Sequence, residues 1–345
     1  MSVASHRLPS VSVIMPVRNG GKYLKSAVDS ILRQKGVDFE LILIDDHSSD
    51  NAIRDLQQDS RLKFFKNDGR GIVDALNLGL AKASHEYFAR MDADDIAHPD
   101  RLAEQTRYLS QNPDIHIAGS KVAIFNEQEP IGTGFAIYQE WLNGRINDQQ
   151  ISEHMFVECC LAHPTFMAKR SLFLELGGYA DNGWPEDYDL ILRAYMQGYR
   201  FGKPETQALL EWRDHSARLS RNDQMYRRTA FLACKAHYLA KHLKKSTKRD
   251  VWIWGAGNTG AKLASLLTRD SCQISGFIDV NEKLTGRTKR NVPVEVIDFS
   301  QDPADFVLGQ RLILICVNAR GVAQKIEEFL LMAGANQGED FLRVS

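Results

Sequence analysis

The 345-residue sequence has the composition of an ordinary folded protein: 43% of its residues are hydrophobic, 25% are charged, and 43 Lys and Arg nearly balance 44 Asp and Glu. This composition excludes a disordered chain, a collagen and a coiled coil. A net charge of −1 argues against a broadly basic surface for nucleic acid. The sequence contains no apolar run of the roughly 18–20 residues that a membrane span needs, and its start lacks a signal-peptide core, so we expect a cytoplasmic protein.

Short apolar runs alternate with amphipathic stretches through the first hundred residues. The pattern predicts strands at 11–15, 41–44, 62–65 and 87–91, and helices at 23–32 and 72–83. Continuous apolar strands separated by helices are typical of a mainly parallel sheet that is covered on both faces. The first domain, predicted to span residues 1–246, is therefore expected to be α/β.

A second, smaller domain is expected at residues 247–345, after the basic stretch 241–249. Its predicted elements are strands at 251–254, 274–278 and 312–317, and helices at 261–267 and 322–333. A glycine-rich turn, Gly255-Ala-Gly-Asn-Thr-Gly260, follows the first of these strands and opens a helix. This arrangement predicts a Rossmann-like unit.

Three polar segments follow predicted strands of the first domain, where α/β sheets bind their ligands: residues 16–19, 45–46 and 91–95. The last segment places the carboxylates of Asp92, Asp94 and Asp95 within four residues, and they would repel one another without a cation between them. Mg²⁺ and Mn²⁺ prefer such oxygens and often keep phosphate oxygens as further ligands. The cluster therefore indicates a metal–diphosphate site, with a helix N-cap before residues 96–111 as the alternative.

A second acidic pair, Glu186-Asp187, precedes the apolar helix expected at 190–196. Two explanations fit an acidic pair at the start of a helix. The carboxylates could compensate the helix dipole, or one of them could be a general base that activates an acceptor hydroxyl.

Seven segments between about residues 10 and 220 together resemble the family-2 inverting glycosyltransferases of GT-A fold. They are VSVIMPVRNGGKYL, ELILIDDHSSD, GIVDALNLGLAKA, YFARMDADDIAHPDRL, HPTFMAKRSLF, GGYADNGWPEDYDL and, more weakly, HSARLS. The resemblance implies that Pro16, Asn19 and Asp46 hold the uridine of a UDP-sugar, with Asp46 accepting from the uracil N–H. Arg18 stands where many members carry an aromatic residue that stacks on uracil, and a guanidinium also stacks on a base.

The same resemblance assigns the remaining site residues. Asp92 and Asp94 look like the family's Asp-x-Asp, with Asp94 as the first choice for the metal ligand and Asp92 nearer the ribose or sugar. His215 matches a late histidine that approaches the metal or diphosphate, and Arg90 could compensate phosphate charge. Asp187 is similar to the family's catalytic base, with Glu186 as the second choice.

The implied reaction is a single in-line displacement. Deprotonated by Asp187, the acceptor hydroxyl attacks the anomeric carbon opposite the departing UDP, and Mn²⁺ or Mg²⁺ neutralises the charge that grows on the diphosphate. The donor would be a UDP-hexose, and the configuration at the anomeric carbon would invert.

The second domain leaves several interpretations open. Its glycines could serve only the tight turn and close packing, or they could bind a nucleotide, a nucleotide-sugar or NAD. The alternative from another class is therefore a nucleotide-sugar- or NAD-binding protein without transferase activity.

The acceptor is a further open question. The two-domain arrangement is similar to that of the animal queuosine-tRNA galactosyltransferases, which implies galactose as a donor sugar and queuosine in tRNA as an alternative acceptor. A saccharide or lipid-linked saccharide is the first expectation. Residues 231–243 could pack in a core or form an amphipathic helix at the inner face of the membrane.

Overall fold

The computed structural model describes residues 8–246 and 248–345 and divides into two compact units. The first unit contains the described residues up to Ile151 together with Cys160–Tyr226. The second contains Ser152–Cys159 and Arg227–Ser345, so it includes a short segment from within the first part of the chain. A boundary of the catalytic domain after residue 246 stays a prediction.

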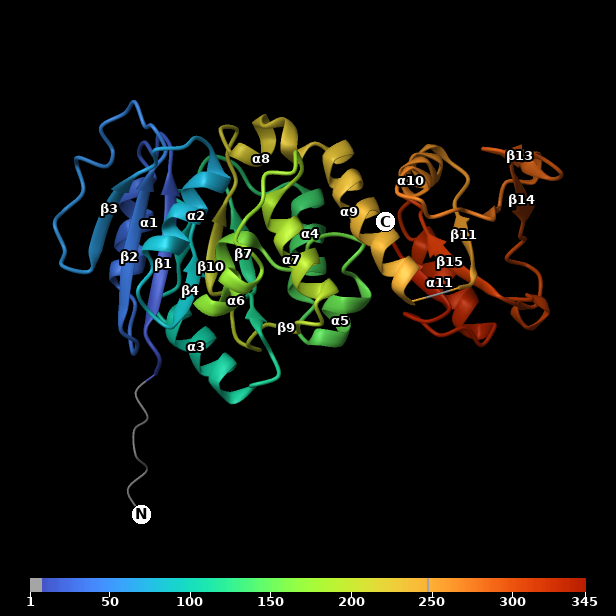
Figure 1. Ribbon diagram of the computed structural model, residues 1–345, viewed down its shortest axis with the longest axis horizontal. Coiled ribbons are helices and arrows are strands. Elements are labelled where there is room, and N and C mark those ends of the chain that lie inside the picture. Colours follow the sequence, from blue (N-terminus) through green and yellow to red (C-terminus); the bar gives the residue numbers. More distant parts are fainter. Residues whose placement is uncertain (1–7, 247) are drawn as a thin grey trace, which may run out of the picture. The chain divides into compact units, whose positions relative to one another are not determined.

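A seven-stranded sheet forms the centre of the first unit (Figure 1). Its strands lie in the order β3 (Leu62–Lys66), β2 (Phe39–Asp45), β1 (Val11–Val17), β4 (Tyr87–Arg90), β8 (Met167–Lys169), β6 (Ile117–Ala118) and β9 (Phe201–Gly202). All neighbouring pairs are parallel except those that involve β8. The predicted mainly parallel sheet is therefore confirmed.

Helices cover this sheet because its strands are apolar on both faces. Alternate residues of β1, among them Val11, Val13 and Met15, share a core with buried residues of α1 (Leu24–Leu32) and α3 (Arg101–Gln111). Ile14, between them, meets α2 (Ile72–Lys82) at Gly79, where a Cβ atom would collide with the Ile14 side chain. Gly79 thus allows α2 to approach β1 closely.

The helix expected at 190–196 is confirmed as α7 (Glu186–Met196), whereas the other remaining elements of the first unit were not predicted. A small sheet has the order β5 (Ile96–Ala97), β10 (Leu210–Arg213) and β7 (Val122–Phe125). The helices are α4 (Thr133–Asn143), α5 (Asp148–Glu153), η1 (His163–Thr165), α6 (Arg170–Glu175), α7 (Glu186–Met196), α8 (Leu219–Asn222) and η2 (Gln224–Tyr226). Because Ile96–Ala97 is a strand and α3 begins only at Arg101, a helix N-cap at Asp92–Asp95 is wrong.

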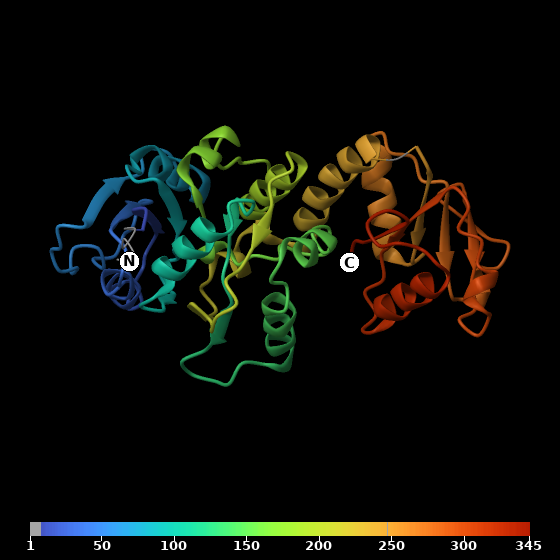
Figure 2. The same cartoon turned by 90° about the horizontal axis from the view of Figure 1, so that it is seen from below.

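The second unit contains a six-stranded sheet, seen from two directions in Figures 1 and 2. The strand order is β13 (Thr288–Lys289), β14 (Val292–Val296), β12 (Gly276–Asp279), β11 (Asp250–Trp254), β15 (Arg311–Ile315) and β16 (Phe341–Arg343). Its helices are α9 (Arg228–Ser246), α10 (Asn258–Arg269), η3 (Glu282–Leu284), η4 (Pro303–Asp305) and α11 (Val322–Met332). The five strands from β14 to β16 are parallel to one another, as in the predicted Rossmann-like unit, and β13 pairs with β14 in the antiparallel direction.

Helix α9 packs against α10 within the second unit. Its side chains Cys234, Tyr238, Leu239 and Leu243 are buried, which supports the core-packing interpretation of this apolar stretch. Among the residues that the structure describes, no helix is both long and apolar enough to cross a membrane.

Candidate active site

The carboxyl ends of β1, β2 and β4 meet at one edge of the first sheet, because these three strands are parallel neighbours. A cavity of about 860 Å³ opens at this edge, a size typical of small-molecule sites. Eight of the predicted site residues contribute to its lining: Pro16, Arg18, Asn19, Asp46, Arg90, Asp92, Asp94 and His215. The fold therefore brings together side chains that are up to about 200 residues apart in the sequence.

Asp46, directly after β2, is a buried carboxylate in the cavity wall. Its Oδ1 accepts hydrogen bonds from Asn67 Nδ2 at 2.8 Å and from the backbone N–H of Gly71 at 3.0 Å. Gly71 has a φ of 91°, a left-handed conformation that favours glycine. These donors fix the orientation of Asp46, and its two oxygens still have lone pairs for a ligand N–H.

Asn19, after β1, holds the neighbouring loop in place. Its Oδ1 accepts from the Ser49 backbone N–H at 2.7 Å, and its own N–H donates to Ser48 Oγ at 3.0 Å. Its φ of 53° lies in the left-handed region, which asparagine tolerates better than most residues. Arg18, next to it, is exposed and lines the cavity.

The Asp-x-Asp segment after β4 is an acidic cluster with cations around it. Carboxylate oxygens of Asp92, Asp94 and Asp95 lie within 4.8 Å of one another. Arg90, which is buried, forms an ion pair with Asp92. His215 Nε2 lies 2.8 Å from Asp94 Oδ2. Three hard carboxylate oxygens beside an imidazole fit a divalent cation such as Mn²⁺ or Mg²⁺.

Burial and nearby charges shift the pKa values of the three carboxyl groups in this cluster in different directions. Burial raises the pKa of Asp92, and the Asp94 charge adds to this effect. Burial also acts to raise the pKa of Asp94, but the hydrogen bond with His215 and the charge of Arg218 outweigh it, so the pKa is lowered. Asp95 is fully buried, which raises its pKa well above the ordinary value. Asp94 is therefore the member of the cluster whose anion is favoured most.

Arg213, at the end of β10, holds the acidic segment through several polar contacts. Its Nε donates to the Asp94 carbonyl at 2.6 Å, its backbone N–H donates to Asp95 Oδ1 at 2.8 Å, and its guanidinium pairs with Glu127. The ring of Tyr23 lies 4.5 Å from the guanidinium carbon. Sequence reasoning missed Arg213, because its partner Asp94 is more than a hundred residues away and no local pattern links them.

Glu186 and Asp187 occupy the first turn of α7 and are not part of the cavity lining. Glu186 is buried, and its Oε2 accepts from the Tyr226 hydroxyl at 2.6 Å. Burial, together with the Asp187 charge, raises the pKa of Glu186 to about 8. Asp187 is half-buried, and its Oδ1 accepts from the Tyr188 backbone N–H at 2.7 Å.

Asp189, also on α7, has a structural role. Its carboxylate is fully buried and accepts from Trp184 Nε1 at 2.8 Å and from Arg193 Nε at 2.7 Å. These contacts tie the loop before α7 to the body of the helix.

Close packing requires glycine at two positions of the glycine-rich turn in the second unit. A Cβ at Gly255 would collide with the Cys316 carbonyl, and a Cβ at Gly260 would collide with the Gly255 carbonyl. Asp279, at the end of the neighbouring strand β12, accepts from the backbone N–H of Ala256 at 2.7 Å. This geometry supports the interpretation that the turn serves close helix–strand packing.

The sheet topology and the acid-lined cavity define the class of protein: a GT-A-like, nucleotide-sugar-dependent glycosyltransferase with a second, Rossmann-like domain. Residues 12–177 match the family described as "Glycosyl transferase family 2", and residues 246–335 match "CoA binding domain". The chain also resembles a solved structure of S. aureus TarS 1-349 in complex with UDP-GlcNAc, with a TM-score of 0.50 and 15% identity over 76% of this chain and 71% of that one.

Curated relatives identify the family. The chain is 31% identical over 254 residues to the "O-antigen biosynthesis glycosyltransferase WbnJ" of Escherichia coli, which covers 70% of this chain and 91% of WbnJ. It is 30% identical over 257 residues to the "Bifunctional glycosyltransferase pgtA" of Dictyostelium discoideum, over 61% of this chain and 33% of pgtA. The chain belongs to glycosyltransferase family 2, so an enzyme is favoured over a nucleotide-binding protein without transferase activity.

Proposed function

We propose that this enzyme transfers a hexose from a UDP-sugar to an acceptor hydroxyl with inversion, in a metal-dependent reaction. The observation that carries the proposal is the convergence of Asp46, Asp92, Asp94 and His215 on one cavity of about 860 Å³. A nucleotide-sugar has a base, a diphosphate and a sugar, and this cavity offers polar groups suited to each part.

The nucleoside end of the donor is proposed to bind near Pro16, Arg18, Asn19 and Asp46. Asp46 is fixed by Asn67 and Gly71, so it can accept from a base N–H without first losing side-chain freedom. Arg18 offers a planar cation that can stack on the base.

The diphosphate is proposed to lie between the acidic cluster and nearby cations. Asp94, Asp92 and His215 would hold Mn²⁺ or Mg²⁺, which supplies positive charge where the leaving diphosphate becomes more negative. Arg90 and Arg218 also line the cavity and add positive charge. The charge of Arg90 partly offsets the burial that raises the pKa of Asp92.

Asp187 is proposed as the general base. It would accept the proton of the acceptor hydroxyl while that oxygen forms a bond to the anomeric carbon and the bond from this carbon to the UDP oxygen breaks. The half-buried side chain of Asp187 suits this role better than the buried side chain of Glu186. Carboxylates can act as bases when they reach the proton they remove within about 3 Å.

The acceptor is proposed to be a saccharide or a lipid-linked saccharide. The name of the E. coli relative, an O-antigen biosynthesis glycosyltransferase, supports this class over queuosine in tRNA. Some of the cations that could contact tRNA are engaged within the chain: Arg221 pairs with Asp214, and Arg249 pairs with Asp340.

Release of UDP from UDP-sugars tests the proposal. Asp187→Asn should reduce UDP release by at least about 100-fold, the typical contribution of a general base, while UDP binding is retained. Asp94→Ala should lose both UDP release and metal-dependent UDP binding. Full activity of the Asp187 variant would overturn the base assignment.

A further inference from the structure

The segment from His215 to Tyr226 forms part of the donor cavity, although no hydrophobic core holds it. We call residues 215–226 the donor-wall segment. Its cavity-lining residues are His215, Ala217, Arg218, Leu219, Asp223 and Met225. All twelve residues are described in the structure, and none of them is buried. Apolar burial therefore contributes little to its position, and polar contacts must hold it in place.

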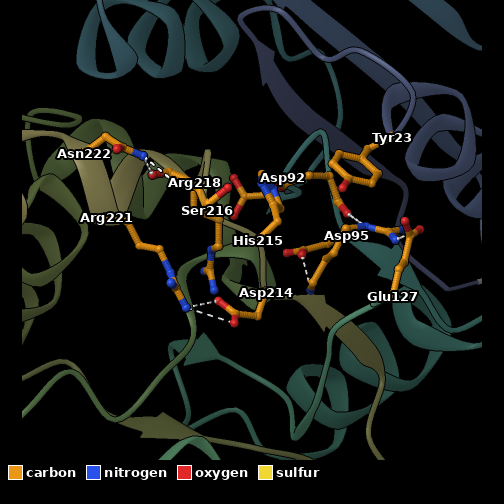
Figure 3. A network of polar contacts seen from close by, with 12 residues as sticks. Tyr23, Asp92, Asp95, Glu127, Asp214, His215, Ser216, Arg218, Arg221 and Asn222 are labelled. Carbon is orange, nitrogen blue, oxygen red and sulfur yellow. Dashed lines mark hydrogen bonds and ion pairs between the residues drawn. The ribbon is translucent and has the colours of Figure 1, made fainter. Parts of the chain in front are cut away.

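Contacts at the start of the donor-wall segment fix it to the small sheet and the acidic cluster. Arg221 Nη2 donates to both oxygens of Asp214 at 2.6 and 2.9 Å (Figure 3). The Arg218 guanidinium lies 4.7 Å from the Trp212 ring. His215 contacts Asp94 at 2.8 Å. Asn222 donates to the carbonyls of Ser216 and Arg218, which stabilises the segment internally without attaching it to the rest of the unit.

The far end of the segment is attached by one strong contact, the hydrogen bond from the Tyr226 hydroxyl to Glu186 Oε2 at 2.6 Å. The side chain of Glu186 is itself held in place by further contacts. His163 Nδ1 lies 3.5 Å from its other oxygen, and His163 Nε2 lies 3.0 Å from the Tyr179 hydroxyl. Asn77 of α2 in turn exchanges two hydrogen bonds with the backbone of Tyr179, at 2.8 and 2.9 Å.

This chain of contacts suggests a role for Glu186 that differs from proton transfer. Its side chain is buried, it is absent from the cavity lining, and both of its oxygens face protein groups. These contacts hold Glu186 as a link between the core of the first unit and the donor-wall segment.

We propose that Tyr226 and Glu186 are a pair of positioning residues that hold the donor-wall segment at the edge of the donor cavity. The inference rests on the proposed function, since it takes this cavity as the UDP site. Without the hydroxyl of Tyr226, the end of the segment loses its attachment, and Arg218 and His215 are held less precisely toward the diphosphate.

Calorimetric titration of the full chain with UDP and Mn²⁺ tests the pair. Tyr226→Phe removes one hydroxyl and keeps the ring, and we expect it to weaken UDP binding about tenfold, in line with the loss of one hydrogen bond. Glu186→Ala should weaken binding to a similar extent. The double variant should bind no more weakly than Glu186→Ala, because both changes remove the same contact.

Two further variants separate positioning from a general effect on folding. Glu186→Gln keeps an oxygen that accepts from Tyr226, so it should bind UDP more tightly than Glu186→Ala. Tyr199→Phe is the matched control: it removes a tyrosine–glutamate hydrogen bond, to Glu175 at 2.9 Å, that lies outside the cavity lining. We expect UDP affinity of Tyr199→Phe to equal that of the wild type.

The outcomes distinguish this inference from the proposed function. Unchanged UDP affinity of Tyr226→Phe would overturn the positioning pair alone. So would a double variant whose UDP affinity falls by the product of the two factors measured for the single variants. Failure of the wild type to bind UDP with Mn²⁺ would overturn the proposed donor site, and the inference with it.

Discussion

At the scale of single residues, the site combines side chains that sequence patterns indicate with others that only the fold brings near. Asp46, Asp92 and Asp94 follow strands, and this placement alone predicts that they share one edge of the sheet. Arg213 and Tyr226 have no such signal. They contact Asp94 and Glu186 across 119 and 40 residues respectively, so the pairing depends on the path of the chain after β10.

His215 provides a prediction at this scale. It contacts Asp94 at 2.8 Å and its ring lies 5.0 Å from that of Tyr23. His215→Ala should weaken Mn²⁺-dependent UDP binding about tenfold or more, because one of the groups proposed to hold the metal is removed. Calorimetry would measure this effect. His85→Ala, outside the cavity lining, serves as the control, and an equal effect of both variants would contradict a specific role for His215.

Glu186 provides a prediction about pH. Its pKa is about 8 in the folded protein against an ordinary value of 4.5, chiefly because of burial and the nearby Asp187 charge. At a pH between 4.5 and about 8, Glu186 carries a proton in the folded protein that it has already released in the unfolded chain. The free energy of unfolding contributed by this group therefore falls as pH rises toward 8. Glutamine resembles the protonated acid and does not titrate. The melting temperature of Glu186→Gln minus that of the wild type should therefore increase from pH 5 to pH 8, and a constant difference would contradict the shift.

At the scale of elements, regular alternation of apolar strands and helices predicted β1 to β4 and α1 to α2, whose long buried faces leave a clear periodicity. The small sheet escaped prediction because β5 has two residues and β10 and β7 have four each, and their pairing is set by tertiary contacts. Helix α4 also escaped prediction, because Leu142 is its only buried residue and its apolar face is weak. Short and half-exposed elements carry too few apolar residues to define a period.

Helix α7 provides a prediction at this scale, through its buried ion pair. Asp189 and Arg193 lie one turn apart, with side-chain exposures of 0% and 18%. Asp189→Ala leaves the Arg193 charge without this partner and should lower the free energy of unfolding by about 3 kcal/mol. Asp29→Ala removes a pair of the same spacing, with Lys25, on the exposed face of α1 and should cost less than about 0.5 kcal/mol. Equal losses in denaturant unfolding would contradict the structural role of Asp189.

At the scale of the whole molecule, each unit has its own sheet and its own core, and the described lining of the donor cavity comes entirely from the first unit. The domain order and both fold classes could be predicted from the sequence, since each unit has long apolar strands and a recognisable turn. The assignment of Ser152–Cys159 to the second unit could not be predicted. Lys235 on α9 accounts for it in part, because its Nζ donates to the carbonyls of Val157 and Val344 at 2.8 Å.

The packing role of the second unit's glycines yields a prediction for the full chain. Gly260→Val should destabilise the protein by about 2 kcal/mol or more, because the new Cβ has no room beside the Gly255 carbonyl. UDP affinity should be unchanged at temperatures where the protein remains folded. Loss of UDP binding without loss of stability would indicate that the turn takes part in donor binding.

The donor site itself is the central claim, and one measurement tests it most directly: calorimetric titration of the purified protein with UDP, UDP-galactose, UDP-glucose and NAD, each with and without Mn²⁺. We expect Mn²⁺-dependent binding of UDP and of one UDP-sugar, and its loss in Asp94→Ala. Asp114 is an exposed acidic residue outside the cavity lining. The control variant Asp114→Ala should bind UDP and the UDP-sugar as the wild type does. Binding of NAD alone, with no affinity for UDP or its sugars, would contradict the account.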